Sequence, residues 1–434
     1  MPKDALRSQP ALAWWKRWLF RLATVGIALV ALELVSWCLW AVAHPQIDWK
    51  TVRDMQTTLA ESAALSTEGT EAIHPYLGWV VDPQVLRNVE IAGERTPVNE
   101  LGFVDNATSL VQRQPGTKIV GVVGGSVSLQ MTWLSEAAFR DELQRHPLFQ
   151  GQKIRIVRLA MSGYKQPQQL MSLSYLLALG GEFDYVINID GFNEIALAVE
   201  DNYVGYVNIA YPRLWQHRLA DVVDPRTTSV SYRLLASRAR RQSLAVWITN
   251  SWLRNSATVN YGWYLYDDRL WKHQMRFGDE LRAHAVAHGR SFARQGPDNH
   301  LPDRQAALRA ALDLWEHSSR QLHHLCAGNG IGYLHVLQPN QYHAGSKPLT
   351  AQERKDFFAE DERFAQAIRN AYPAAIERGA ALRREGIAFV DLTPLFAAET
   401  DTIYTDFCCH YNQQGNDLFA TAVARALAEL AERE

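Results

Sequence analysis

Five short apolar runs, separated by helical patterns, most constrain the fold of this chain of 434 residues. The runs are rich in Val and Ile and are bounded by Gly, Pro or Asn, as buried strands are. They lie at Lys118–Val123, Ile154–Leu159, Tyr185–Ile189, Tyr333–Leu337 and Ile387–Val390. Helical periodicity marks Trp133–Arg145, Gln166–Leu179, Arg304–Cys326, Ala351–Arg384 and Asn416–Glu432. This alternation predicts an α/β fold, a three-layer sandwich with a parallel sheet of about five strands, whose active site lies beyond the carboxyl ends of the strands.

Residues 196–303 interrupt this alternation, because they are far longer than an ordinary connection. Helical periodicity is visible around Ser231–Leu253 and Trp271–Phe292, and the segment is rich in Trp, Tyr, Arg and His. We therefore expect a mostly helical insertion. Its aromatic side chains either pack a small subdomain, form a ligand surface or make an amphipathic contact with the membrane.

Residues 19–42 form an apolar stretch that predicts a transmembrane helix, since about 21 apolar residues after Arg21 suffice to cross a bilayer. Basic residues concentrate before it, at Lys3, Arg7, Lys16, Arg17 and Arg21. The positive-inside rule then leaves residues 1–18 in the cytoplasm and the C-terminal domain outside it. We expect a single-pass inner-membrane protein with a periplasmic or extracytoplasmic domain. A cleaved signal peptide or a buried globular helix is the alternative.

Glu33 is the one acidic residue within this apolar stretch. A carboxylate at that depth is costly unless it is protonated or paired. Glu33 therefore either contacts a partner helix or lies near the outer interface, and we favour the second interpretation. Beyond the stretch, residues 43–113 read as a connecting and flanking region with weak periodicity, and residues 114–434 as the catalytic domain that carries the insertion.

Composition excludes several functions. A net charge of −2 without a domain-sized basic block gives no basis for nucleic-acid binding. The four cysteines have no zinc or redox spacing, so we expect no metal and no cofactor. A structural disulfide framework is not expected, although a bond between the adjacent Cys408 and Cys409 is one alternative.

Four segments that follow predicted strands carry the candidate chemistry. Gly124-Gly125-Ser126 follows the first strand, where glycines permit a tight turn and a serine hydroxyl can point into the crevice. A helix that starts at this serine would favour developing negative charge, although such a serine can also merely cap the helix. Gly163 follows the second strand, Asn193 the third, and His410 precedes the last helix.

These blocks resemble those of the SGNH (GDSL-type) hydrolase superfamily, in particular membrane-anchored bacterial members, from about residue 118 to the C-terminus. Gly-Gly-Ser stands in place of the common Gly-Asp-Ser, and His-Tyr-Asn-x-x-Gly-Asn is similar to the family's last block. The resemblance implies a flavodoxin-like sheet, Ser126 as the nucleophile and His410 as its base. It also implies an oxyanion hole formed by the backbone N–H of Ser126, Gly163 and the side chain of Asn193.

One position departs from the family pattern. The aspartate usually stands three residues before the histidine, where this chain has Phe407, and Asp406 stands four residues before. We expect Asp406 to orient His410 as the third catalytic residue. A backbone carbonyl or another carboxylate such as Asp391 is the alternative.

The expected function is a serine esterase or O-acyltransferase that acts on acyl, especially acetyl, esters. Extracytoplasmic placement and the aromatic insertion favour a polysaccharide or glycan substrate, because aromatic faces suit sugar rings. The family resemblance implies a membrane-bound O-acyltransferase as the kind of protein partner. The second hypothesis is a binding or assembly subunit of an envelope polysaccharide-modifying complex, in which the same fold has lost catalysis. The shifted Asp406 is the only sequence feature that favours it.

Overall fold

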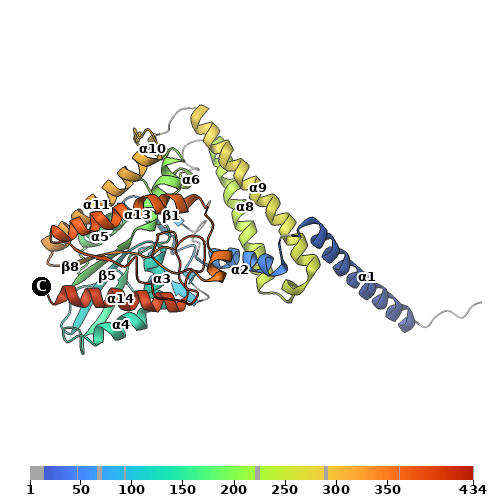
Figure 1. Cartoon of the computed structure of the whole chain (residues 1–434), viewed down its shortest axis with the longest axis horizontal. Helices are drawn as coiled ribbons and strands as arrows, with labels where there is room; N and C mark the ends of the chain where they lie inside the picture. The colour runs from blue at the N-terminus through green and yellow to red at the C-terminus, as the bar shows by residue number, and fades with distance from the viewer. Residues whose placement is uncertain are drawn as a thin grey trace, which may run out of the picture. The chain divides into compact units, whose positions relative to one another are not determined.

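The structure of the chain is a computed structural model (Figure 1). It describes residues 14–45, 47–65, 71–91, 94–219, 225–287, 292–360 and 362–433. The chain divides into two compact units. The hairpin unit comprises Met1–Ala63 and Ser237–Met275, and the sheet unit comprises Ala64–Ala236 and Arg276–Glu434.

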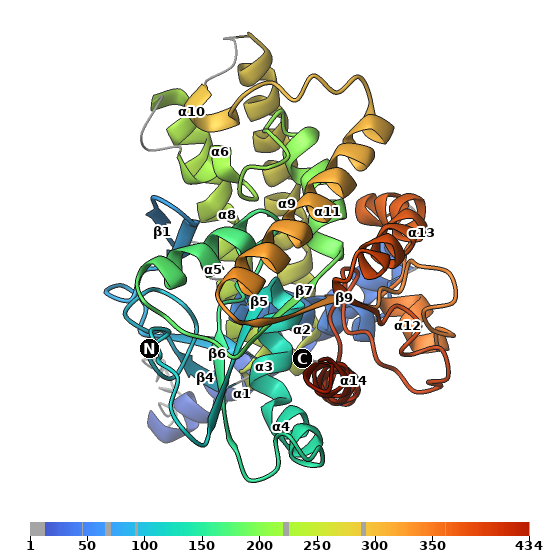
Figure 2. The same cartoon turned by 90° about the vertical axis from the view of Figure 1, so that its left-hand side faces the viewer.

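The sheet unit contains a five-stranded parallel sheet (Figure 2). Its strands are β5 (Thr117–Gly124), β6 (Lys153–Arg158), β7 (Tyr185–Asp190), β8 (Gly332–Leu337) and β9 (Ala388–Asp391). Their order is β6-β5-β7-β8-β9, and every neighbouring pair is parallel. All residues of β7 and β8 are buried, which is why these strands are almost continuously apolar. The predicted α/β fold and its parallel sheet are confirmed.

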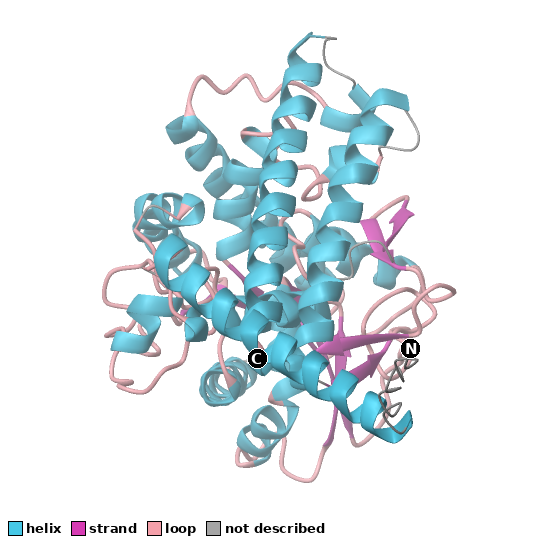
Figure 3. Cartoon of the chain, turned by 90° about the vertical axis from the view of Figure 1, so that its right-hand side faces the viewer, coloured by secondary structure: helices cyan, strands magenta, loops and turns pink. Residues whose placement is uncertain are grey.

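Two groups of helices flank this sheet (Figures 2 and 3). Within each group the helices contact one another, and each group contacts strands of the sheet. The first group is α3 (Ser126–Leu134), α4 (Glu136–Gln144) and α14 (Gln413–Ala431). The second is α5 (Gln168–Ala178), α11 (Arg304–Gly328) and α13 (Arg363–Arg384). The strand order places a topological switch point between β5 and β7, the position at which open parallel sheets commonly bind ligands.

Two predicted helices are each divided in the structure. The stretch 133–145 belongs to α3 and α4, because Ser135 leaves the helical conformation with φ −128° and ψ 25°. The stretch 351–384 contains α12 (Ala351–Asp356) and α13. Between them the chain turns so that Phe358 packs against Tyr342, with ring centroids 5.2 Å apart. A helical period continues across such breaks, so the sequence pattern did not reveal them.

The region 43–113 is more structured than its weak periodicity indicated. It contains α2 (Trp49–Leu65) and two antiparallel hairpins, β1 (Glu71–His74) with β2 (Gly78–Val81) and β3 (Asn88–Ile91) with β4 (Glu94–Pro97). Each of these strands has four residues, too few to give a clear alternation.

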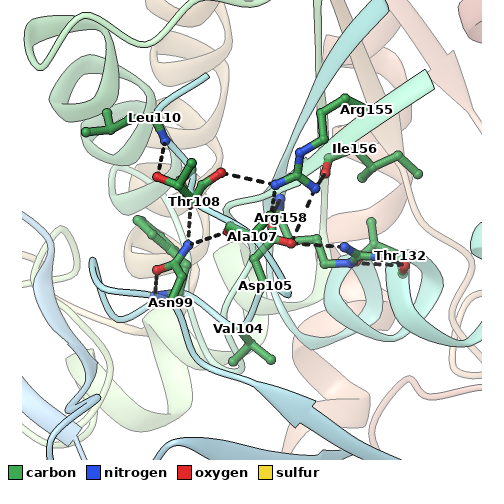
Figure 4. Close-up of polar contacts among 12 residues, drawn as sticks. Asn99, Val104, Asp105, Ala107, Thr108, Leu110, Thr132, Arg155, Ile156 and Arg158 are labelled. Atoms are coloured by element: carbon green, nitrogen blue, oxygen red, sulfur yellow. Dashed lines mark hydrogen bonds and ion pairs between the residues drawn. The ribbon is translucent and has the colours of Figure 1, made fainter. Parts of the chain in front are cut away.

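A buried ion-pair network joins this region to the sheet (Figure 4). Asp105 and Arg158 have fully buried side chains, and their nearest atoms are 3.1 Å apart. Arg158 also donates to the backbone oxygen of Thr132 from Nε at 3.1 Å and from Nη2 at 2.8 Å. Arg155 contacts the other oxygen of Asp105 at 3.2 Å. A buried charge is tolerated only when it is paired, so this network fixes the segment after β4 against β6 and α3.

Residues 196–303 are mainly helical where the structure describes them. They include most of η1 (Asn193–Tyr203), α6 (Trp215–Arg218), α8 (Pro225–Thr249), η2 (Trp252–Asn255), α9 (Ala257–Ala287) and α10 (Phe292–Gln295). The expected second helix, at Trp271–Phe292, is α9, which begins fourteen residues earlier, at Ala257. The boundary between the two units falls within α8 and α9.

The N-terminal helix α1 (Trp14–Ala43) is 30 residues long. Its most apolar window of 18 residues has a mean hydropathy of 2.1, so the helix is long and apolar enough to cross a membrane. Only 11% of that window is buried, which separates α1 from the core helix of a globular protein.

Candidate active site

The turn from β5 into α3 presents Ser126 at the carboxyl end of the sheet. Gly124 has a φ of +150°, and a Cβ there would lie 2.0 Å from Ser128 Oγ and 2.3 Å from the backbone oxygen of Ile189. A Cβ on Gly125 would lie 2.2 Å from the side-chain nitrogen of Asn193. Both positions therefore require glycine, and together they allow α3 to begin at Ser126 directly after the strand.

Ser126 and Ser128 have different environments. Ser126 is partly exposed at the first position of α3, where backbone N–H groups have no partner within the helix. Ser128 is buried and donates its hydroxyl to the backbone oxygen of Ile189 at 3.1 Å. Ser128 is thus committed to the packing of α3 against β7, and Ser126 is the serine that a substrate can reach.

His410 connects Ser126 to Asp406. Its Nε2 is 2.7 Å from Ser126 Oγ, and its Nδ1 is 2.5 Å from Asp406 Oδ2. The His410 and Asp406 side chains are 15% and 26% exposed, so both are largely buried but not closed off from solvent. These are the contacts that a nucleophile, its base and an orienting carboxylate require.

The geometry of Asp406 explains how a carboxylate four residues before the histidine can reach the imidazole. Its Oδ1 accepts hydrogen bonds from the backbone N–H groups of Cys408 at 2.9 Å, Cys409 at 3.0 Å and His410 at 3.3 Å. The chain therefore winds around one carboxylate oxygen and leaves the other directed at Nδ1. Asp391, the alternative orienting residue, instead accepts from the backbone N–H of Thr393 at 2.9 Å.

Asp406 and His410 shift each other's pKa. Burial lowers the pKa of His410, but the charge and hydrogen bond of Asp406 outweigh burial and raise it to about 9. Burial raises the pKa of Asp406, but the charge and hydrogen bond of His410, with the backbone N–H donors, lower it to about 2. Asp406 is consequently an anion at neutral pH and stabilises the imidazolium that forms when His410 accepts a proton.

The loop that carries Asp406 and His410 is held by residues after β8. Three consecutive carbonyls of the loop accept side-chain hydrogen bonds, Asp406 O from Gln341 at 2.9 Å, Phe407 O from Tyr342 at 3.0 Å, and Cys408 O from Asn340 at 2.9 Å. The sequence alone did not assign a role to Asn340, Gln341 or Tyr342. No local pattern signals these contacts, because more than sixty residues separate the partners.

Gly163 and Asn193 lie next to the serine turn. The Asn193 side chain donates to the backbone oxygen of Tyr164 at 2.7 Å and lies against Gly125. It is therefore wedged between the residue after Gly163 and the residue before Ser126. Since an amide nitrogen has two hydrogens, the second remains for a ligand. Gly163 has a φ of +83°, and the backbone N–H of Met161, two residues earlier, donates to Gly124 O at 3.2 Å.

Buried ionisable groups that the sequence alone did not reveal support the end of the third strand of the sheet, β7. Glu194 accepts hydrogen bonds from the backbone N–H of Gly191 at 2.8 Å and from the Gln169 side chain at 2.7 Å. Burial and the nearby Asp190 raise the pKa of Glu194 to about 8. Asp190 contacts His335 Nε2 at 2.8 Å, where both side chains are fully buried. These groups hold the end of β7 and the turn that precedes Asn193, and no motif spacing would have revealed them.

Arg213 borders the opposite side of Gly163. A Cβ on Gly163 would lie 3.3 Å from Arg213 Cδ and 3.6 Å from its Nη1, so the Arg213 side chain lies next to Gly163. Arg213 is paired with the buried Asp201 at 2.6 Å. A fixed cation therefore lies beside the strand-end loop that carries Gly163.

Among the residues that the structure describes, Cys408, Cys409 and His410 place three possible ligand atoms within 4.8 Å of one another. Both cysteines are free thiols, so the alternative of a disulfide between them is not what the structure has. Burial raises the pKa of both thiols, which disfavours the thiolates that bind metals. Both ring nitrogens of His410 already have partners, so this cluster fits a serine–histidine site better than a metal site.

Comparison with models of known protein families gives no match, and comparison with curated proteins gives none either. What the site can do must therefore be argued from its residues.

Proposed function

We propose that the protein is a membrane-anchored, extracytoplasmic serine esterase or O-acyltransferase of SGNH type, with the three-layer arrangement of that superfamily. The observation that carries the proposal is the position of His410 between Ser126 and Asp406, at 2.7 Å and 2.5 Å. The length and exposure of α1 favour the anchor.

In the proposed reaction, Ser126 Oγ attacks the carbonyl carbon of an acyl ester while His410 Nε2 accepts its proton. The backbone N–H groups of Ser126 and Gly163 and the side chain of Asn193 stabilise the oxyanion of the tetrahedral intermediate. His410 then returns the proton to the leaving alcohol, which leaves the acyl group on Ser126. Water completes hydrolysis of this ester, whereas a hydroxyl of a glycan completes acyl transfer beside a membrane-bound O-acyltransferase.

The second hypothesis, a binding or assembly subunit without catalysis, depended on a misplaced Asp406. Because Asp406 contacts His410 and is held by three backbone N–H groups, that feature no longer favours it. An O-acetylated polysaccharide remains the proposed substrate class, since an extracytoplasmic site would meet such polymers.

A fluorophosphonate probe tests the nucleophile in the full-length protein in detergent. We expect covalent labelling on a peptide that contains Ser126, and hydrolysis of p-nitrophenyl acetate. Ser126→Ala should abolish labelling and lower kcat by about 10⁶-fold, as loss of the nucleophile does in serine hydrolases.

The matched control is Ser128→Ala, which alters a serine two residues away that only packs against β7. This variant should keep its labelling and most of its activity. Labelling of Ser126→Ala at the wild-type rate, or equal ester hydrolysis by wild type and Ser126→Ala, would refute the catalytic proposal.

A further inference from the structure

The hairpin unit contains an unexpected contact between α1 and the start of α9. Glu33 Oε2 accepts hydrogen bonds from the backbone N–H groups of Ala257 at 2.7 Å and Thr258 at 3.3 Å, the first two residues of α9. The hydroxyl of Ser256 donates to the other oxygen of Glu33. A carboxylate at this position complements the free N–H groups and the positive end of the helix dipole. The helix that Glu33 contacts thus belongs to the same chain.

A second set of contacts shows the direction of α9 along α1. Seven residues after Glu33, Trp40 packs against Tyr261 and Tyr264, with ring centroids 5.6 Å and 5.0 Å apart. Glu33 of α1 thus lies level with the first residue of α9, and Trp40, seven residues later, lies level with the fifth to eighth residues of α9. Over this stretch α9 runs beside α1 in the same direction. The tip of the hairpin, residues 250–256 between α8 and α9, lies level with Glu33.

The position of Glu33 along α1 gives the depth of this tip. Twelve residues of helix separate Arg21 from Glu33, and ten separate Glu33 from Ala43, or about 18 Å and about 15 Å at 1.5 Å per residue. The hydrocarbon layer of a bilayer is about 30 Å thick. If Arg21 marks its cytoplasmic edge, Glu33 lies in the outer half of the layer, and so does the hairpin tip that it binds.

The side chains of the tip suit this depth. Trp252 is 82% exposed and Trp247, at the end of α8, is 56% exposed. Leu253 and Arg254 follow Trp252 in the tip. At about 12 Å below the outer edge of the hydrocarbon layer an indole ring contacts acyl chains, and the long side chain of Arg254 can extend toward the headgroups. A shallow groove of about 630 Å³, lined by residues such as Val246, Trp247 and Asn250, continues from the tip along α8. In water these exposed indole rings would be unfavourable.

We propose that the tip of the α8–α9 hairpin inserts into the outer leaflet beside α1, so that lipid is the partner of Trp247 and Trp252. This inference rests on the proposal that α1 spans the membrane. Lipid surrounds the exposed face of a spanning α1 at every level, so an element hydrogen-bonded to Glu33 enters the same layer. The contact gives the protein a second attachment to the membrane, which limits its rotation about α1.

Depth-dependent fluorescence quenching tests the proposal on the full chain in vesicles of phosphatidylethanolamine and phosphatidylglycerol. A genetically encoded fluorescent amino acid replaces Trp252, Leu29 or Leu179, one position at a time. Leu29 is an exposed residue of α1, and Leu179 is an exposed residue of the sheet unit. Lipids carry a nitroxide quencher on the headgroup, high on the acyl chain or near its end.

Leu29 and the level of Glu33 each lie about 12 Å from the nearer edge of the hydrocarbon layer. We therefore expect quenching at positions 252 and 29 chiefly by the lower-chain nitroxide, and none at position 179. Quenching at position 29 without quenching at position 252 would overturn the hairpin proposal and leave the anchor intact. Quenching at neither position would show that α1 is not in the bilayer, and both proposals would fail.

The Glu33→Ala variant tests the link between the two elements. It should reduce quenching at position 252 and leave quenching at position 29 unchanged, because the start of α9 loses its acceptor. Thr24→Ala is the matched control, since Thr24 is an exposed residue of α1 whose hydroxyl donates only to the backbone of Phe20. Unchanged quenching at position 252 in Glu33→Ala would contradict the role of Glu33.

Discussion

Ser126 and His410 lie within hydrogen-bond distance, but the molecule holds them by different means. Ser126 is positioned by its immediate neighbours, two glycines that permit the turn and the helix that begins at the serine. His410 is positioned by Asp406 and by side chains that follow a strand more than sixty residues away in the sequence. A local arrangement is rigid because backbone conformation is fixed by sterics. A distributed arrangement depends on the sum of several hydrogen bonds.

This difference predicts how the two halves respond to substitution. A change on the serine side should be abrupt, because an added Cβ has no space to enter. A change on the histidine side should be graded, because each hydrogen bond contributes separately, except at Asp406 itself. Three substitutions, taken from the largest expected effect to the smallest, test this comparison.

Asp406→Asn should have the largest effect. An amide can keep the backbone contacts of the loop but favours the wrong tautomer of His410 and cannot stabilise the imidazolium, so kcat should fall by about 10⁴-fold. The shifted pKa of His410 gives a second expectation, for the pH dependence of the rate. Because Asp406 raises the pKa of His410 and the base must be neutral, the acid limb of the wild-type pH–rate profile should lie above neutral pH. In the variant the limb should move toward about 6.5, the ordinary histidine value.

Steady-state hydrolysis of p-nitrophenyl acetate from acid to alkaline pH measures both effects. Asp391→Asn is the control, because Asp391 accepts a hydrogen bond from Thr393 and does not contact His410. It should leave the rate and the acid limb unchanged. A large loss in Asp391→Asn together with a mild effect of Asp406→Asn would reverse the assignment of the orienting residue.

Gly125→Ala should have the next largest effect, on the serine side. The new Cβ would lie 2.2 Å from the Asn193 side-chain nitrogen and must displace it. Loss of one oxyanion donor lowers kcat by about 10²–10³-fold. Gly328→Ala is the matched control, since a Cβ there meets no atom within 4 Å. Near-normal kcat in Gly125→Ala would mean that the amide of Asn193 is not an oxyanion donor.

The serine side and the histidine side also differ in how much of their structure the sequence could predict. The five strands were predictable from short Val-rich and Ile-rich runs, because a buried parallel strand needs apolar residues on both faces. The placement of Ser126, Gly163 and Asn193 after strands followed from the predicted strands, and the family resemblance implied their roles. The contact between Asp406 and His410 did not follow from the sequence, because it depends on a turn in which three backbone N–H groups donate to Asp406 Oδ1.

Contacts between distant segments could also not be predicted from the sequence. Glu33 and Ser256 are 223 residues apart, and nothing in either segment alone indicates the pairing. The same holds for the buried pair of Asp190 and His335. Such pairs are specified by the packing of the whole fold, and a single sequence carries no periodicity for them.

Tyr342→Phe should have the smallest effect and tests whether the histidine side is graded. The substitution removes only the hydroxyl that donates to Phe407 O at 3.0 Å, while Gln341 and Asn340 still hold the neighbouring carbonyls. One such hydrogen bond contributes about 1 kcal/mol, which corresponds to a roughly fivefold loss of kcat if all of it positions the base. A looser loop also weakens the contact of Asp406 with His410, so the acid limb should shift slightly to lower pH. Tyr76→Phe is the matched control, because Tyr76 is 68% exposed and lies outside the histidine loop. A loss of kcat as large as that of Asp406→Asn would show that the hydroxyl of Tyr342 is indispensable. The histidine side would then respond to substitution as abruptly as the serine turn.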